Sequence, residues 1–151
     1  MDYEDLDLDH PIRHEKTIAG IPTSNKELFD LLKAWLAITV AFTILLNGLQ
    51  FNANTILIII IAAITVGSGF LLHELMHKLV AQKYKCWAEF RADDTMLLVA
   101  IGFSFFGFIF AAPGAVMISG NIDYKRNGII SLAGPLTNYI LGMLFLGLMF
   151  L

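Results

Sequence analysis

An HELMH sequence at residues 73–77 interrupts an apolar run that extends from residue 55 to residue 81. The run is long enough for a membrane-spanning helix, which needs about 20 apolar residues. Ionisable side chains are costly inside such a helix, and those that occur there are by default read as functional. The HELMH motif therefore limits the chain to folds in which a membrane helix carries a functional site.

Composition places the chain among polytopic membrane proteins. Of its 151 residues, 57% are hydrophobic and 15% are charged, whereas about 25% of an average soluble domain is charged. The single cysteine, Cys86, excludes an intrachain disulfide and disfavours a thiolate metal site, so we expect a small buried hydrophobe. The net charge of −3 reflects acidic residues gathered in the first fifteen positions, which indicate a solvated tail.

We expect an all-α polytopic membrane protein with about 3–4 membrane segments and a small strand-like or re-entrant insertion. Residues 1–23 form an acidic, disordered cytoplasmic tail in this interpretation, and residues 24–151 form the membrane domain. Its predicted helices are residues 24–47, 54–83 and 128–151, and the first begins at a capping box formed by Ser24 and Glu27. The segment 86–119 is the strand-like or re-entrant insertion, because glycines and Pro113 punctuate its apolar stretch.

The basic residues predict an orientation. Lys26 and Lys33 lie at the start of the first helix, and a further basic cluster follows the second helix at residues 78–91. The positive-inside rule then places the N-terminus and the HELMH end of the second helix in the cytoplasm. Lys125 and Arg126 stay on that side only if residues 95–118 dip into the membrane and return, so we favour a re-entrant segment over a crossing.

The HELMH motif has the spacing of a metal site. His73 and His77 are four residues apart, so on a helix both imidazoles lie on one face and can reach one metal ion. Glu74 is placed to act as a general base towards a metal-bound water. Chance HExxH patterns on the surface of soluble helices are the alternative, and the membrane setting favours the metal site. His73 lies roughly 28 Å along its helix, near one membrane face.

A second motif, AGPLTN at residues 133–138, adds to the first. HELMH and AGPLTN, each in an apolar helix, resemble the signatures of the site-2 protease family of intramembrane zinc metalloproteases (peptidase M50-like), over roughly residues 55–151. The resemblance implies a zinc ion bound by His73 and His77, with Glu74 as the base that hydrolyses peptide bonds of membrane-embedded substrates. It also implies strands between the two motif helices that hold the substrate in extended form, where residues 86–119 lie.

Asn138 has two interpretations of similar weight. Pro135 has no N–H to donate to the carbonyl of Ser131, so it loosens the last helix one turn before Asn138. The Asn138 amide can then donate to a substrate carbonyl or to the developing oxyanion, which would make it catalytic. Alternatively, it makes a hydrogen bond between helices.

The sequence departs from the family pattern at the third zinc ligand. The family supplies an aspartate from an LDG-type motif on a further helix, and this sequence contains no such motif, so we expect a fragment, a truncated product or a degenerate member. Asp93, Asp94 and Asp123 are poor replacements, because solvated loop carboxylates explain them better. Water or a second chain are the other sources of a third ligand.

Several functions stay open beside the intramembrane zinc protease. A non-catalytic metal-binding membrane protein and a structural protein descended from a protease are the alternatives, and a metal transporter is a weaker one. Glu74→Gln separates the first two, since a protease keeps its metal and loses activity, whereas a protein that uses Glu74 as a ligand loses metal. We expect the lipid bilayer and a transmembrane protein or peptide substrate as partners, and no nucleic acid.

Overall fold

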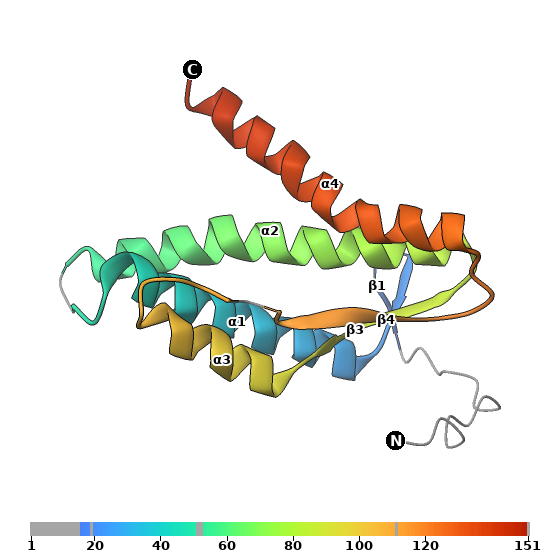
Figure 1. Cartoon of the computed structure of the whole chain (residues 1–151), viewed down its shortest axis with the longest axis horizontal. Coiled ribbons are helices and arrows are strands. Elements are labelled where there is room, and N and C mark those ends of the chain that lie inside the picture. Colours follow the sequence, from blue (N-terminus) through green and yellow to red (C-terminus); the bar gives the residue numbers. More distant parts are fainter. Residues whose placement is uncertain (1–15, 19, 51–52, 111, 151) are drawn as a thin grey trace.

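The computed structural model describes residues 16–18, 20–50, 53–110 and 112–150, and within them the chain is mainly helical (Figure 1). The elements run in the order β1 (Lys16–Ile18), β2 (Ile21–Thr23), α1 (Asn25–Asn47), α2 (Thr55–Lys83), β3 (Trp87–Ala92), α3 (Asp94–Ser104), β4 (Gly114–Ser119) and α4 (Tyr124–Leu148). Two antiparallel two-stranded sheets accompany the helices, β1 with β2 and β3 with β4.

Helices α1, α2 and α4 are long and apolar enough to cross a membrane. Their large apolar side chains are widely exposed, as a lipid-facing surface requires. The chain is thus a helical polytopic membrane protein with a small strand insertion, which confirms the predicted fold class.

Helices α1 and α2 pack closely because a glycine of α2 receives a tryptophan of α1. The indole nitrogen of Trp35 donates to the carbonyl of Ala63 at 3.1 Å. A methyl group on Gly67 would overlap the Trp35 ring. The small residues that precede the HELMH motif therefore serve close helix packing.

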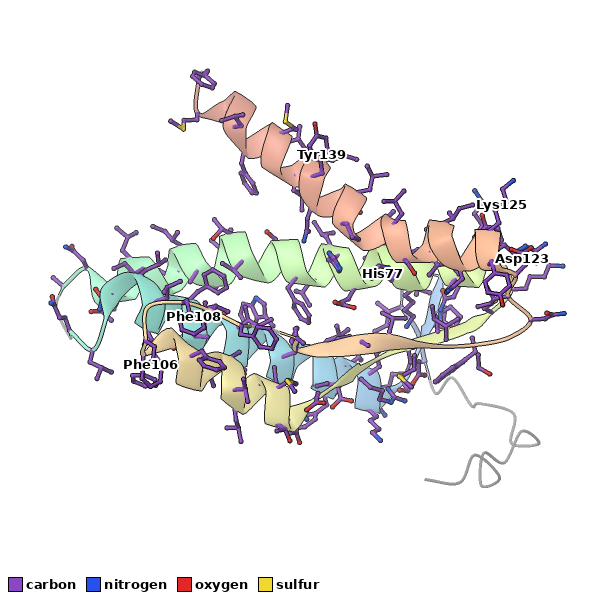
Figure 2. All side chains as sticks on the ribbon, in the orientation of Figure 1. His77, Phe106, Phe108, Asp123, Lys125 and Tyr139 are labelled. Atoms are coloured by element: carbon purple, nitrogen blue, oxygen red, sulfur yellow. The ribbon has the colours of Figure 1, made fainter. Side chains whose placement is uncertain are left out.

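The segment between the two motif helices leaves the sheet and returns to it. Asp93 caps α3 by accepting from Met96 N at 3.0 Å, and its own N–H donates to Pro113 O at 3.0 Å. Strand β4 then pairs with β3 along its whole length, from Ala92 opposite Gly114 to Trp87 opposite Ser119. At 1.5 Å per residue α3 is only about 16 Å long, half the ~30 Å hydrocarbon core. The segment forms a hairpin, and Phe106 and Phe108 lie at its tip (Figure 2).

One end of the molecule gathers the elements that matter for the site. The C-terminal part of α2, the start of α1, the β3–β4 sheet and the start of α4 all lie there (Figure 1). Lys125 marks the start of α4 at this end (Figure 2). Farther along, the second half of α4 diverges from α2, and its side chains, such as Tyr139, are exposed.

Two boundaries differ from those expected. Residues 16–18 and 21–23 pair as strands β1 and β2, which corrects the expected disorder there. These strands are rich in β-branched residues, and Gly20, just before β2, adopts a φ of +82°. Residues 1–15, the rest of the expected tail, lie outside the described residues. Helix α4 begins at Tyr124, four residues before the expected start, because Asp123 caps it by accepting from Arg126 N at 2.7 Å.

Candidate metal centre

The two histidines of the HELMH motif lie together on the face of α2 that contacts α4, and Figure 2 shows where His77 lies. Their ring centroids are 4.8 Å apart and the ring planes are inclined by 77°. The helical spacing of four residues produces this pairing, as the sequence predicts. With Glu74 they line a cavity of about 380 Å³ between α2, β4 and α4.

A backbone carbonyl of α4 fixes the orientation of His77. Its Nδ1 lies 2.7 Å from Ile130 O, and a carbonyl oxygen can only accept, so Nδ1 carries the proton. The lone pair of Nε2 is then free for a metal ion. Metal-binding histidines generally donate their second ring N–H to a carbonyl or carboxylate in this way.

Asn138 contacts His73 in the same manner from one turn after the proline of α4. Its amide nitrogen lies 3.1 Å from His73 Nδ1. The oxygen and nitrogen of an amide exchange places by a 180° rotation of the group, and with the oxygen turned to His73 it accepts from an Nδ1–H group and leaves Nε2 free to bind a metal. The interhelical hydrogen bond expected as one interpretation of Asn138 is therefore present, and its partner is a predicted metal ligand.

Gly134 leaves open the space onto which both histidines converge. A methyl group at this position would lie 2.5 Å from His73 Nε2 and would also overlap His77 Nε2. The nitrogens that have free lone pairs thus border one small space beside Gly134. Zinc binds neutral imidazole nitrogens at about 2.0–2.1 Å, so two converging Nε2 atoms with an open space between them fit this metal.

Glu74 is buried and borders the same cavity. It is 9% exposed, and neither a hydrogen bond nor an ion pair joins its carboxylate to another residue of the described ranges. A buried carboxylate without a protein partner is costly. Since Glu74 also lines a second, apolar cavity of about 300 Å³ on the side of α1, it is accessible to a small molecule such as water.

Strand β4 presents an open edge to the cavity. Phe90 N donates to Glu27 of α1 at 3.0 Å, so Phe90 and its partner Val116 form a pair without mutual hydrogen bonds. The N–H and C=O groups of Val116 must therefore point away from β3. Alternation along the strand gives Gly114 and Ile118 the same orientation, and all three residues line the cavity.

No group of three or more His, Cys, Asp or Glu side chains arranged for metal binding occurs within the described part of the chain. Asp93 and Asp123 are helix caps, and Asp94 forms an ion pair with Lys33. The three aspartates weighed as replacement ligands thus have structural partners. The described residues thus offer two histidine nitrogens to a metal ion, whereas a catalytic zinc typically has three protein ligands.

Sequence reasoning missed three contributors to this arrangement. The space left by Gly134 and the carbonyl of Ile130 depend on how α4 packs against α2, which no local pattern reports. The third is the buried pair of Glu27 and Lys78, described below. The sequence signal for this pair was the presence of the charged residues Glu27 and Lys78 within or beside apolar helices.

A search of curated proteins finds one informative relative. The chain is 44% identical over 128 residues to a Methanocaldococcus jannaschii protein named "Putative zinc metalloprotease", in a match that covers 83% of this chain and 63% of the relative. The chain thus spans less than two thirds of that protein's length. No protein-family model matches the chain. No solved structure matches it either.

Proposed function

We propose that this chain carries the zinc-binding and general-base residues of an intramembrane metalloprotease of the site-2 protease type. The observation that supports it most is the convergence of the two Nε2 atoms on the space beside Gly134, with the Glu74 carboxylate in the same cavity. The similarity to a relative named for zinc metalloprotease activity supports the coarser part of the proposal.

Each residue of the site has a distinct role in this proposal. His73 and His77 hold the zinc ion, and Ile130 and Asn138 keep the two rings in the tautomer that metal binding needs. When bound, zinc supplies a positive charge that acidifies water and polarises a peptide carbonyl. Glu74 accepts the proton of the attacking water and returns it to the leaving amine.

Asn138 has a second role in this proposal beside its contact with His73. Its amide can donate to a substrate carbonyl or to the developing oxyanion, as the sequence suggested. The primary role of Asn138 is to orient His73, because that hydrogen bond is the one that the side chain makes.

The substrate in this proposal is a transmembrane segment that unwinds and pairs with the open edge of β4. Helical peptide bonds are shielded by their own hydrogen bonds, so cleavage requires an extended conformation. Val116 and its two neighbours at alternate positions offer N–H and C=O groups to such a strand. The edge lies in the same cavity as Glu74, which would bring the paired strand to the base.

We further propose that the motif end of α2 faces the cytoplasm. The start of α1, the end of α2 and the start of α4 lie at the same end of the molecule, and each carries basic residues there. This arrangement agrees with a multi-pass protein in a cell membrane whose catalytic residues lie near one membrane face.

The alternative is a membrane protein that binds metal without catalysis, or a structural descendant of a protease. The observation that favours it is the pair of histidines without a third ligand among the described residues. Under the main proposal the third ligand is a water molecule or comes from a second chain.

Glu74→Gln tests the proposal. The change removes the base but keeps the shape of the side chain, so we expect loss of peptide cleavage of at least 100-fold at unchanged zinc content. The substrate is a labelled apolar peptide of about 20 residues with a central Asn-Gly sequence, long enough to span a bilayer. Cleavage that persists in the variant would remove Glu74 from the mechanism, and loss of zinc would identify it as a ligand.

A further inference from the structure

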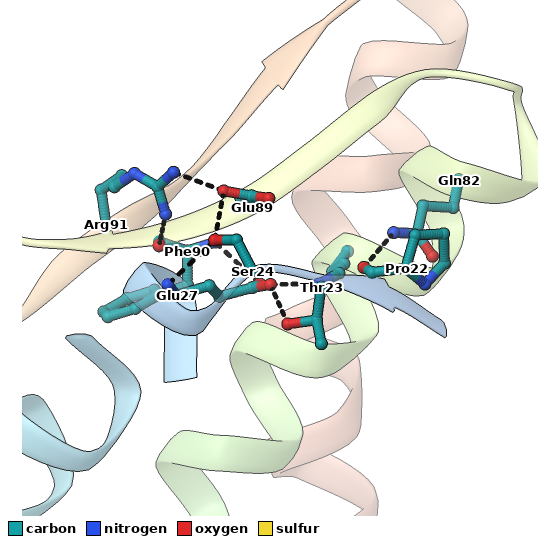
Figure 3. Close-up of polar contacts among 9 residues, drawn as sticks. Pro22, Thr23, Ser24, Glu27, Gln82, Glu89, Phe90 and Arg91 are labelled. Carbon is teal, nitrogen blue, oxygen red and sulfur yellow. Dashed lines mark hydrogen bonds and ion pairs between the residues drawn. The ribbon is translucent and has the colours of Figure 1, made fainter. Parts of the chain in front are cut away.

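A buried carboxylate at the start of α1 takes no part in the proposed chemistry. Glu27 is 1% exposed, yet it accepts from donors in three separate segments (Figure 3). The Thr23 hydroxyl donates to its Oε2 at 2.5 Å, the Lys78 ammonium reaches the same oxygen, and Phe90 N donates to its Oε1 at 3.0 Å. A glutamate at the third position of a helix commonly returns to the capping residue. Here the Glu27 carboxylate instead connects α1 to α2 and to β3.

One of these donors belongs to the helix that carries the HELMH motif. Lys78 follows His77 directly and lies one turn after Glu74 on the same face of α2. It is 4% exposed and pairs with Glu27. Buried charges of opposite sign hold each other firmly, because an unpaired one would remain in a medium of low dielectric constant. Glu27 is therefore attached to α2 within one turn of the proposed base.

Another donor belongs to the strand next to the open edge. The Phe90 N–H points at Glu27 and away from β4, and the Phe90 ring packs on Phe70 of α2 with centroids 5.5 Å apart. Val116, the partner of Phe90 across the sheet, carries the outward N–H and C=O groups in the cavity. The bond from Glu27 to Phe90 thus fixes β3, and through the register it fixes the open edge of β4.

A neighbouring network attaches the same strand to the start of α1. Ser24 Oγ donates to Glu89 Oε2 at 3.1 Å, and Arg91 pairs with the same carboxylate (Figure 3). These contacts connect β3 to α1 without reaching α2. Glu27 differs because its carboxylate contacts both α2 and β3 directly.

We propose that Glu27 is a positioning residue that sets the distance between the HELMH helix and the strand edge on which a substrate lies. This inference rests on the proposed function, because the edge matters only if a substrate pairs with it. Small displacements of a reacting group relative to a catalytic group reduce rates strongly, by about 100-fold for 1 Å. Glu27 would thus act on the rate at saturating substrate rather than on substrate binding or on zinc.

Two double variants of the full chain isolate the bond to Phe90. Glu27→Gln with Lys78→Met removes both charges and keeps an acceptor for the Phe90 N–H. Glu27→Leu with Lys78→Met removes the acceptor as well. Lys33→Met is the control, because it removes a charged side chain of α1 whose ion pairs are with Asp30 and with Asp94 of α3, and neither partner is a residue of β3.

Three quantities are measured in detergent: amide hydrogen exchange of residues 87–92 and 114–119, zinc per chain, and cleavage of the labelled transmembrane peptide. For the leucine variant we expect exchange at least tenfold faster than for the glutamine variant, kcat at least tenfold lower, KM within about threefold, and equal zinc. The Lys33→Met control should match the wild type. A general loss of folding would lower the zinc content as well, so faster exchange and a lower kcat at equal zinc content indicate a change in positioning.

Exchange and kcat in the leucine variant equal to those of the wild type would overturn the proposal, since Glu27 would then be a structural residue only. The exchange comparison also separates this inference from the proposed function. A wild type without zinc and without cleavage would refute the protease, while faster exchange in the leucine variant would still assign the positioning of β3 and β4 to Glu27.

Discussion

A methyl group added at Gly134 should remove most of the zinc affinity. In the Gly134→Ala variant the new carbon would lie 2.5 Å from His73 Nε2 and 2.6 Å from His73 Cδ2, and it would also overlap His77 Nε2. Carbon contacts are favourable only at about 3.5–4.0 Å, so α4 and the rings must separate by about 1 Å. Metal ligands tolerate only about 0.2 Å. Overpacking of this kind costs about 1–3 kcal/mol, which corresponds to a zinc affinity lower by about 5- to 150-fold.

The assay is competition with a zinc chelator, followed in detergent-purified protein. Gly128→Ala is the matched control, because it lies in the same helix and its methyl would meet nothing within 4 Å. We expect the control to keep the wild-type affinity, and replacing a helical glycine by alanine even favours the helix. A Gly134→Ala chain that binds zinc as tightly as Gly128→Ala would refute the placement of the metal between the two Nε2 atoms.

Asn138→Ala removes the partner of His73 Nδ1, so we expect a 10- to 100-fold loss of zinc affinity by the same competition assay; unchanged affinity with a lower kcat would instead assign the amide to the substrate. Gly67→Ala would place a methyl group against the Trp35 indole, so we expect about 1–3 kcal/mol less stability, seen as a lower thermal midpoint. Gly142→Ala, whose methyl meets nothing within 4 Å, is the control for that change, and an equal midpoint in the two variants would contradict the packing argument.

The features that could be predicted from the sequence are the local ones. An apolar run with two histidines four residues apart specifies both a membrane helix and a shared helix face, and the structure places His73 and His77 together on α2. The return of the chain after α3, seen in the pairing of β4 with β3, agrees with the re-entrant segment favoured from basic residues on both sides of it. The membrane side on which those residues lie stays a prediction. The role of the pair as a metal site stays a prediction.

The features that could not be predicted depend on contacts between distant segments. Glu27 meets Phe90 across 63 positions and Lys78 across 51, and no periodicity links these residues. The sequence indicated a capping box at Ser24, and Ser24 does accept from Glu27 N at 3.1 Å. Because that contact already caps the helix, the Glu27 carboxylate is available for Lys78 and Phe90 and does not return to Ser24. The space beside Gly134 likewise exists only once α4 lies on α2.

Zinc content per chain is the first measurement to make on the proposed site of His73 and His77. The measurement compares the detergent-purified 151-residue wild type with His73→Ala, which loses one of the two converging nitrogens. Our account predicts about one zinc per chain in the wild type and loss of that zinc in the variant. A wild type without zinc, or a variant that retains the same zinc content, would contradict it.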